Sequence, residues 1–165
     1  MVYVIFLCIA LPLMLMLPIL EKRSRLLVGF LLMGMFVALA AYELDTILYP
    51  LTGMETLIFT QTVTPMVEET LKALPILVFV LVFSDSRNGI LSIAMSVGIG
   101  FAVLENTVIL VHGIYGVTLG WAALRGLSTG LMHGLCTMII GFGLSFVKKQ
   151  KKLFYTGIFG LWSVA

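Results

Sequence analysis

Six ionisable side chains interrupt otherwise apolar stretches of this 165-residue chain. A charged group inside an apolar helix is costly unless it is paired, so such groups usually mark a site. Carboxylates and histidines are also the side chains that take protons from water and bind zinc. The six residues are Glu68, Glu69, Lys72, Glu105, Arg125 and His133. We expect four of them, Glu68, Glu69, Glu105 and His133, to come together around one water-accessible site.

Three of the charges lie within five residues of one another. In a helix, Lys72 follows Glu69 by three residues and Glu68 by four, so its ammonium group can reach either carboxylate. Adjacent side chains point in different directions, so we expect one glutamate to face a reaction centre and the other to pair with Lys72 or a neighbouring helix. A purely structural ion pair between Glu69 and Lys72 is an equally good interpretation. Pro65 frees a backbone carbonyl and can open the helix locally.

A polar stripe is predicted in a later apolar stretch. Its members recur at steps of four residues, which places them on one helix face: Arg125, Thr129, His133 and Thr137. Arg125 can alternatively serve as an interfacial anchor. Counted from the outer ends of their stretches, Glu68, Glu105 and His133 lie at depths of about 10–21 Å, at roughly 1.5 Å per residue. They can therefore meet in one layer in the outer half of a membrane.

The composition is that of a membrane protein. Hydrophobic residues make up 61% of the chain and charged residues 11%, against about 25% charged in a soluble domain. The net charge is +2, and the cations are concentrated at a few helix ends. We therefore expect membrane lipid as a partner and no nucleic acid.

Six apolar stretches can be distinguished, near residues 2–20, 26–43, 58–83, 89–112, 119–147 and 153–165. They predict an all-α fold, a polytopic transmembrane helix bundle of about six spans with the last one incomplete. Residues 1–165 would form a single transmembrane domain, with a site-bearing core at about 58–147. A ladder of small residues, Gly126, Gly130 and Gly134, predicts a surface where another helix packs closely.

The basic residues predict the orientation of the bundle. Eight of the ten Lys and Arg residues lie in three alternate connections, 21–25, 84–88 and 148–152. The intervening connections, 44–57 and 113–118, contain none. The positive-inside rule then places the basic connections in the cytoplasm and the N-terminus outside, in an integral plasma-membrane protein.

The last apolar stretch is short. Residues 153–165 number thirteen, whereas a span needs about 20. A chain that entered from the cytoplasmic side would end near the middle of the membrane, with backbone carbonyls lacking partners. We therefore expect this sequence to be part of a longer protein.

Taken together, the polar residues resemble three motifs of a known family. Glu68-Glu69-x-x-Lys72, then Phe101-x-x-x-Glu105-Asn106, then His133-x-x-x-Thr137 after an arginine, are similar in order and spacing to those of the PrsW-type intramembrane proteases. That family shares a clan with type II CAAX prenyl endopeptidases and bacteriocin-processing enzymes. Glu105 stands where the CAAX branch has histidine, which favours the PrsW branch. The resemblance implies a membrane-anchored regulatory substrate, such as an anti-sigma factor, cut at its outer side. It also implies a further polar motif, often with a histidine, that this sequence does not contain, so we expect the site to lack one ligand or catalytic partner.

The resemblance also implies roles for individual residues. Glu68, Glu69, Glu105 and His133 would be the catalytic residues. Glu69, Glu105 and His133 are the candidate ligands of a zinc ion, the expected cofactor, which would activate water and polarise the peptide carbonyl. In a metal-free version, one glutamate activates water while His133 and either Asn106 or Thr137 form an oxyanion site. Lys72, Asn106, Arg125 and Thr137 would support the site.

Other functions stay open at this point. One alternative is a CAAX-type or bacteriocin-processing membrane protease that works without metal. Another is a small proton or cation transporter, in which the carboxylates and His133 relay charge. A third is a scaffolding membrane protein with polar helix-packing pairs, although that leaves His133 and Glu105 unexplained. The sequence predicts neither the substrate sequence nor the oligomeric state.

Overall fold

The computed structural model describes residues 1–83, 86–113 and 118–147. These residues form five helices: α1 (Val2–Met16), α2 (Lys22–Thr52), α3 (Thr56–Val82), α4 (Arg87–His112) and α5 (Leu119–Val147). The predicted all-α fold is confirmed for this part of the chain. The count of about six spans is not, because the sixth apolar stretch, 153–165, lies outside the described residues.

Three of the five helices are long and apolar enough to cross a membrane, namely α2, α4 and α5. Helix α1 has only 15 residues, fewer than the roughly 20 that a span requires. Helix α3 has 27 residues, but two glutamates and a lysine lie near its middle, and it is not among the candidate spans. The chain is therefore an integral membrane protein in which α3 carries the buried charged residues Glu69 and Lys72.

Helix α2 ends later than hydropathy indicated. We expected a span at 26–43 and a connection at 44–57, yet the helix continues to Thr52 and ends at Gly53, which has a φ of 63°. The drop in hydropathy after residue 43 reflects a more polar environment around the helix and does not end it. The helix ends where Gly53 adopts the left-handed backbone conformation. As a result, Asp45 lies on a helix that faces the rest of the bundle.

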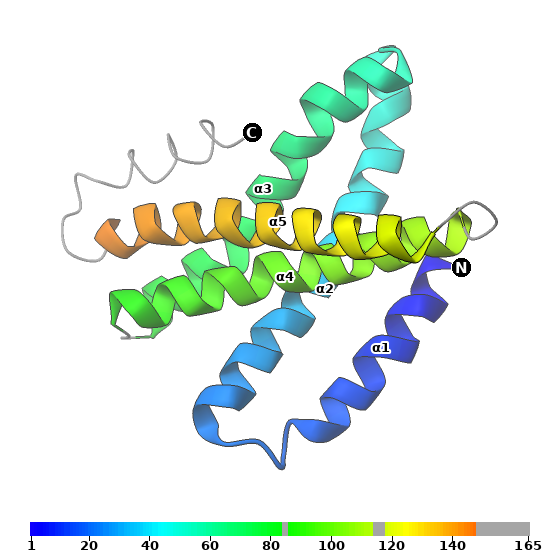
Figure 1. Cartoon of the computed structure of the whole chain (residues 1–165). Coiled ribbons are helices and arrows are strands. Elements are labelled where there is room, and N and C mark those ends of the chain that lie inside the picture. The colour runs from blue at the N-terminus through cyan, green and yellow to red at the C-terminus, as the bar shows by residue number, and fades with distance from the viewer. Residues whose placement is uncertain (84–85, 114–117, 148–165) are drawn as a thin grey trace.

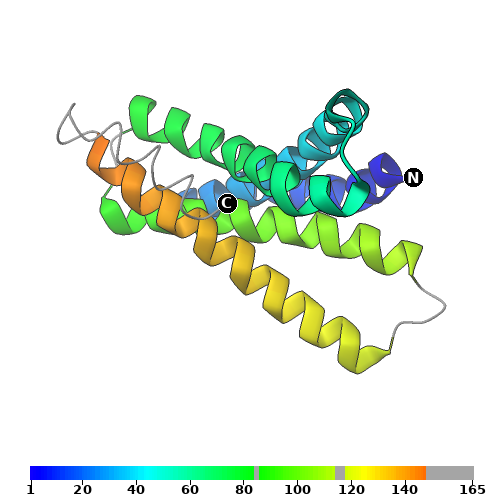
Figure 2. The same ribbon diagram turned by 90° about the horizontal axis from the view of Figure 1, so that it is seen from above.

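Helix α4 is the centre of the bundle. It lies antiparallel beside α5 and crosses α2, while α1 packs on their edge (Figure 1). Seen from above, α3 lies on the same side of the α4–α5 pair as α1 and α2 (Figure 2). The largest buried cluster joins α3, α4 and α5 through side chains that are fully excluded from solvent, among them Ile76, Ile93, Val97 and Ile140.

Glycines allow the backbones around α4 to approach one another. A Cβ at Gly100 would collide with the backbone carbonyl of Leu31 on α2, and a Cβ at Gly98 would collide with the backbone carbonyl of His133 on α5. Small residues at crossings give such close contact in membrane bundles. Helix α5 can seat His133 against α4 because position 98 has no side chain.

The predicted glycine ladder on α5 behaves differently. A Cβ at Gly134 would be in ordinary contact with Ile99 and Met95 of α4, as expected for a packing surface. At Gly126 and Gly130 a Cβ would meet no atom within 4 Å among the described residues. The prediction of close packing is therefore wrong at Gly126 and Gly130 within this part of the chain. At these positions α5 contacts α4 through a neighbouring face of the helix.

The α2–α4 crossing gives a prediction about stability. Gly100→Leu forces a side chain into the Leu31 backbone, and overpacking of this kind costs about 1–3 kcal/mol or more. We expect a clearly lower midpoint of thermal unfolding for the variant in detergent micelles. Gly126→Leu is the matched control and should unfold close to wild type. Equal midpoints for the two variants would show that the crossing does not need the glycine.

Candidate active site

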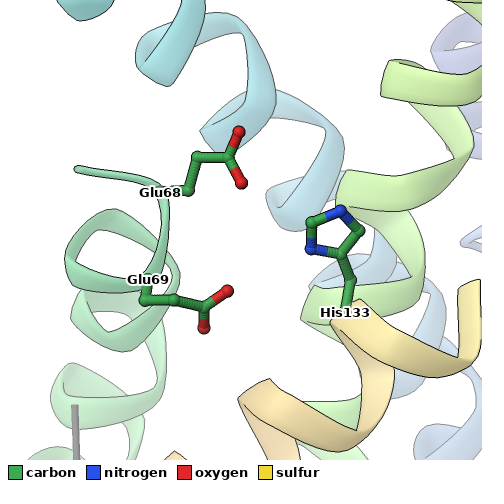
Figure 3. Close-up of side chains that lie close together, drawn as sticks. All are labelled: Glu68, Glu69 and His133. Atoms are coloured by element: carbon green, nitrogen blue, oxygen red, sulfur yellow. The ribbon is translucent and has the colours of Figure 1, made fainter. Parts of the chain in front are cut away.

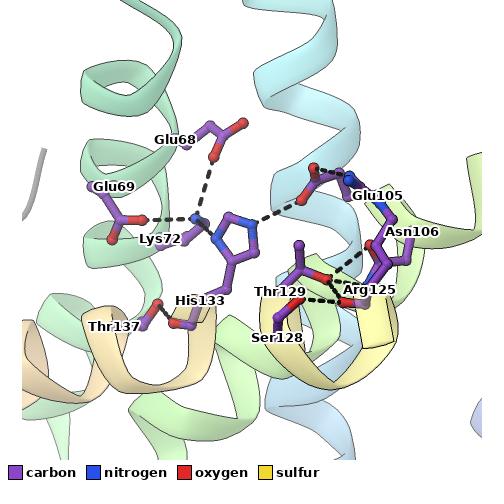
Figure 4. Close-up of polar contacts among 10 residues, drawn as sticks. All are labelled: Glu68, Glu69, Lys72, Glu105, Asn106, Arg125, Ser128, Thr129, His133 and Thr137. Atoms are coloured by element: carbon purple, nitrogen blue, oxygen red, sulfur yellow. Dashed lines mark hydrogen bonds and ion pairs between the residues drawn. The ribbon is translucent and has the colours of Figure 1, made fainter. Parts of the chain in front are cut away.

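Three helices bring the charged residues together. The paired glutamates and the lysine come from α3, which remains one continuous helix through Pro65. The predicted local opening at this proline is therefore not seen. Glu105 on α4 and His133 on α5 lie beside the lysine, and Arg125 pairs with Glu105 from the N-terminal part of α5 (Figure 4). Residues far apart in sequence thus form one connected polar network.

Lys72 is the centre of this network and is fully buried. Its Nζ lies 2.8 Å from Glu69 Oε1, 3.5 Å from Glu68 Oε2 and 2.8 Å from His133 Nδ1. An ammonium group has three N–H donors, so all three have an acceptor. The same nitrogen lies 3.9 Å from the centre of the Phe101 ring, which adds a cation–π contact.

The partners of His133 indicate its tautomer. Because Nδ1 faces an ammonium group, which can only donate, we assign Nδ1 as an acceptor and place the proton on Nε2. Nε2 then donates to Glu105 Oε2 at 2.8 Å. Glu105 is held in turn by Arg125, 3.3 Å from Oε1. A carboxylate on the far nitrogen orients a histidine so that its other nitrogen presents a lone pair.

The two glutamates have different surroundings. Glu69 is buried and bonded to Lys72 through Oε1, whereas its Oε2 has no hydrogen-bond partner among the described residues. Glu68 retains 19% side-chain exposure. Together with Glu105 it lines a cavity of about 210 Å³ between α1, α2, α3 and α4. Glu69 therefore faces Lys72 alone, whereas Glu68 faces both Lys72 and the cavity.

The neighbouring polar residues brace the helices. Asn106 Nδ2 donates to Thr129 Oγ1 at 2.6 Å, and the Thr129 hydroxyl donates to the Arg125 carbonyl at 2.5 Å. The Thr137 hydroxyl donates to the backbone carbonyl of His133 at 2.7 Å. A metal-free oxyanion site would use Asn106 or Thr137, but the Thr137 hydroxyl and one N–H of the Asn106 amide are engaged inside the bundle.

The donor set is suited to a divalent cation. Glu68, Glu69 and His133 each offer a ligand atom, and these atoms lie within 4.8 Å of one another (Figure 3). Carboxylate oxygens and a histidine nitrogen are zinc ligands, and Glu69 Oε2 lacks a partner in the described structure. Lys72 binds the same three side chains, so its ammonium group competes with a metal for them.

The sequence-based ligand set differs from this group in one member. We expected Glu69, Glu105 and His133, whereas the structure groups His133 with both adjacent glutamates. Glu105 instead bonds to the opposite ring nitrogen of His133. Sequence spacing could not show which side of the imidazole each carboxylate would reach.

One acidic residue beside the site was not predicted to take part. Asp45 of α2 lines the same cavity as Glu68 and Glu105, although we placed it in an outer connection. A signal was present: Ala38, Ala41 and Asp45 follow one another at three and four residues, which is one face of a helix. The early end assigned to that helix concealed it.

Comparison with known proteins identifies the family of the chain. Neither the curated proteins nor the solved structures with which the chain was compared gave a match. A family model described as PrsW family intramembrane metalloprotease matches residues 22–165, which include every residue of the polar network but not α1. The match covers most of the chain and confirms the resemblance seen in the motifs. The chain therefore belongs to the PrsW family of intramembrane metalloproteases.

Proposed function

We propose that this protease hydrolyses a peptide bond of a membrane-anchored regulatory protein, with Glu68 as the base that activates water. The observation that carries the proposal is the difference between the paired glutamates. Glu68 lines the cavity, whereas Glu69 is buried against Lys72. A general base must contact the attacking water molecule and lie next to the space that the substrate occupies.

The reaction can be followed through the residues of the chain. Glu68 takes a proton from water as the water oxygen attacks the carbonyl carbon of the scissile peptide bond. The same carboxyl group returns that proton to the amide nitrogen as the carbon–nitrogen bond breaks. Acid–base work by one positioned side chain typically contributes about 10²–10⁴-fold in rate. Apolar helices around the site limit access of bulk water.

We assign the metal to Glu69 and the Nδ1 atom of His133, next to Glu68. A zinc ion bound there would acidify a bound water molecule and polarise the substrate carbonyl. Glu105 holds the His133 ring with Nδ1 directed toward the glutamates. This revises the ligand set expected from the sequence, in which Glu105 was a direct ligand. Arg125 keeps Glu105 in place through its ion pair.

The membrane location supports a substrate that is itself anchored in the membrane. The cavity beside Glu68 is lined mostly by apolar side chains of α2 and α4, two of the helices able to span a membrane. The basic connections favour an external N-terminus in the plasma membrane. An anti-sigma-factor-like protein, cut at its outer side, meets these requirements.

The paired glutamates provide the first functional test. Glu68→Gln retains the shape of the side chain and removes the base, so we expect cleavage of a membrane-anchored substrate to fall by about 10²–10⁴-fold. Glu69→Gln should also lose most activity, through metal binding. The measurement is the cleavage rate in liposomes, with Glu55→Gln outside the site as control. Wild-type rates in both folded variants would disprove the mechanism.

Competition between Lys72 and a metal gives a second test. Lys72→Met removes the ammonium group that is bonded to the three candidate zinc-binding side chains. We therefore expect zinc to bind about ten- to a hundredfold more tightly, given the strength of charged hydrogen bonds. Isothermal titration on purified protein measures this affinity. His133→Ala should abolish stoichiometric binding.

Two outcomes would contradict the metal assignment. One is unchanged zinc affinity in the Lys72→Met variant. The other is full peptidase activity of the wild-type protein after chelation, which would favour the metal-free version instead.

The orientation can be tested by labelling single cysteines in a background that lacks Cys8 and Cys136. We use Thr52 at the end of α2, and Asn88 rather than Ser86, because the Ser86 hydroxyl caps α4. An impermeant thiol reagent should label position 52 and not position 88 in intact cells, because the basic connections face the cytoplasm. The reverse pattern would invert the topology.

A further inference from the structure

The cavity beside Glu68 contains a third carboxylate. Its volume is about 210 Å³, below the roughly 300–1,000 Å³ of sites for small-molecule ligands, so it suits a single side chain. Its walls are mainly aliphatic and aromatic, and the acidic residues that line it are Asp45, Glu68 and Glu105. The cavity therefore joins the proposed reaction centre to Asp45.

Asp45 differs from the other two acids in its partners. Glu68 lies 3.5 Å from Lys72, and Glu105 is paired with Arg125. Among the described residues, Asp45 has no ion pair, and no hydrogen bond of normal geometry reaches its buried Oδ1. The Thr64 hydroxyl of α3 lies close enough to the carboxyl group to stabilise its charged form, but it carries no positive charge.

We propose that Asp45 forms a subsite for a cationic side chain, lysine or arginine, of the substrate. The inference rests on the proposed function, because it places the subsite next to the bond that Glu68 attacks. Asp45 is partly buried, and a carboxylate without a cationic partner beside apolar helices is costly. A cation from the substrate offsets that cost when it binds. Substrates that supply the cation are thereby selected.

The cavity walls match the rest of such a side chain. The methylene stem of lysine or arginine can lie along apolar surface while the charged end reaches a polar group. Ala38 and Ala41 leave room on the α2 side, and Leu104 and Val108 form the α4 side. A second metal ion fits less well, because Asp45 is not part of the ligand group formed by Glu68, Glu69 and His133.

The test is a cleavage profile of the full chain in liposomes. The substrates are single-span peptides whose residues near each membrane end are randomised, and the cut positions are read by mass spectrometry. We expect wild-type cuts to favour lysine or arginine at one fixed position by about ten- to a hundredfold, from the strength of a charged hydrogen bond. Asp45→Asn should remove this preference, and Asp45→Lys should favour aspartate or glutamate at the same position.

Glu43→Gln is the matched control. Glu43 lies two residues from Asp45 on α2, bonds to the Tyr3 hydroxyl and faces a different cavity. It should retain the wild-type profile. Wild-type cuts without basic enrichment, or an unchanged preference in Asp45→Asn, would overturn this inference while the proposed protease activity stands. No cleavage at all by the wild-type chain would overturn the proposed function and the subsite with it.

Discussion

A fully buried lysine sets the arrangement of this bundle. The Lys72 ammonium group must bond through all of its hydrogens, because an uncompensated charge in a low-dielectric interior is costly. Its own helix supplies two carboxylates at three and four residues' distance, and the third acceptor can come only from another helix. Helix α5 must therefore bring His133 Nδ1 within 2.8 Å. This contact limits the distance between α3 and α5 at the site.

The rest of the core accommodates that contact. Helix α4 packs against both α2 and α5. Gly98 of α4 lets the backbone of α5 approach closely at His133. Phe101 of α4 lies against both Lys72 and the imidazole ring, with 5.0 Å between the centres of the two rings. Glu105, one turn later on the same helix, holds the far side of the imidazole. Packing and electrostatics thus act on the same residues.

The network also explains why adjacent glutamates can have different roles. Both lie within reach of Lys72, but only Glu68 extends to the cavity, while Glu69 is enclosed by the lysine and its neighbours. Lys72 holds the two glutamates together, because two carboxylates side by side repel each other without a cation between them. The same donors suit a metal, in agreement with the family to which the chain belongs.

The sequence by itself determined the class of the fold, the family and the membership of the polar network. Apolar stretches separated by charge predicted the helices, because helix length and hydropathy are local properties. The spacing of Glu68, Glu69 and Lys72 predicted their ion pairs for the same reason. Charge and spacing also predicted that His133 and Glu105 would share a site, since isolated burial is costly.

Only the tertiary structure decided which atoms meet. It placed Glu105 on Nε2 of His133 rather than among the grouped ligand atoms, and it brought Asp45 into the cavity by extending α2 to Thr52. Spacing within one helix says nothing about the rotation of a neighbouring helix around its own axis. That rotation depends on glycine contacts and side-chain packing between segments far apart in the chain, and it selects the nitrogen or carboxylate oxygen that faces the site.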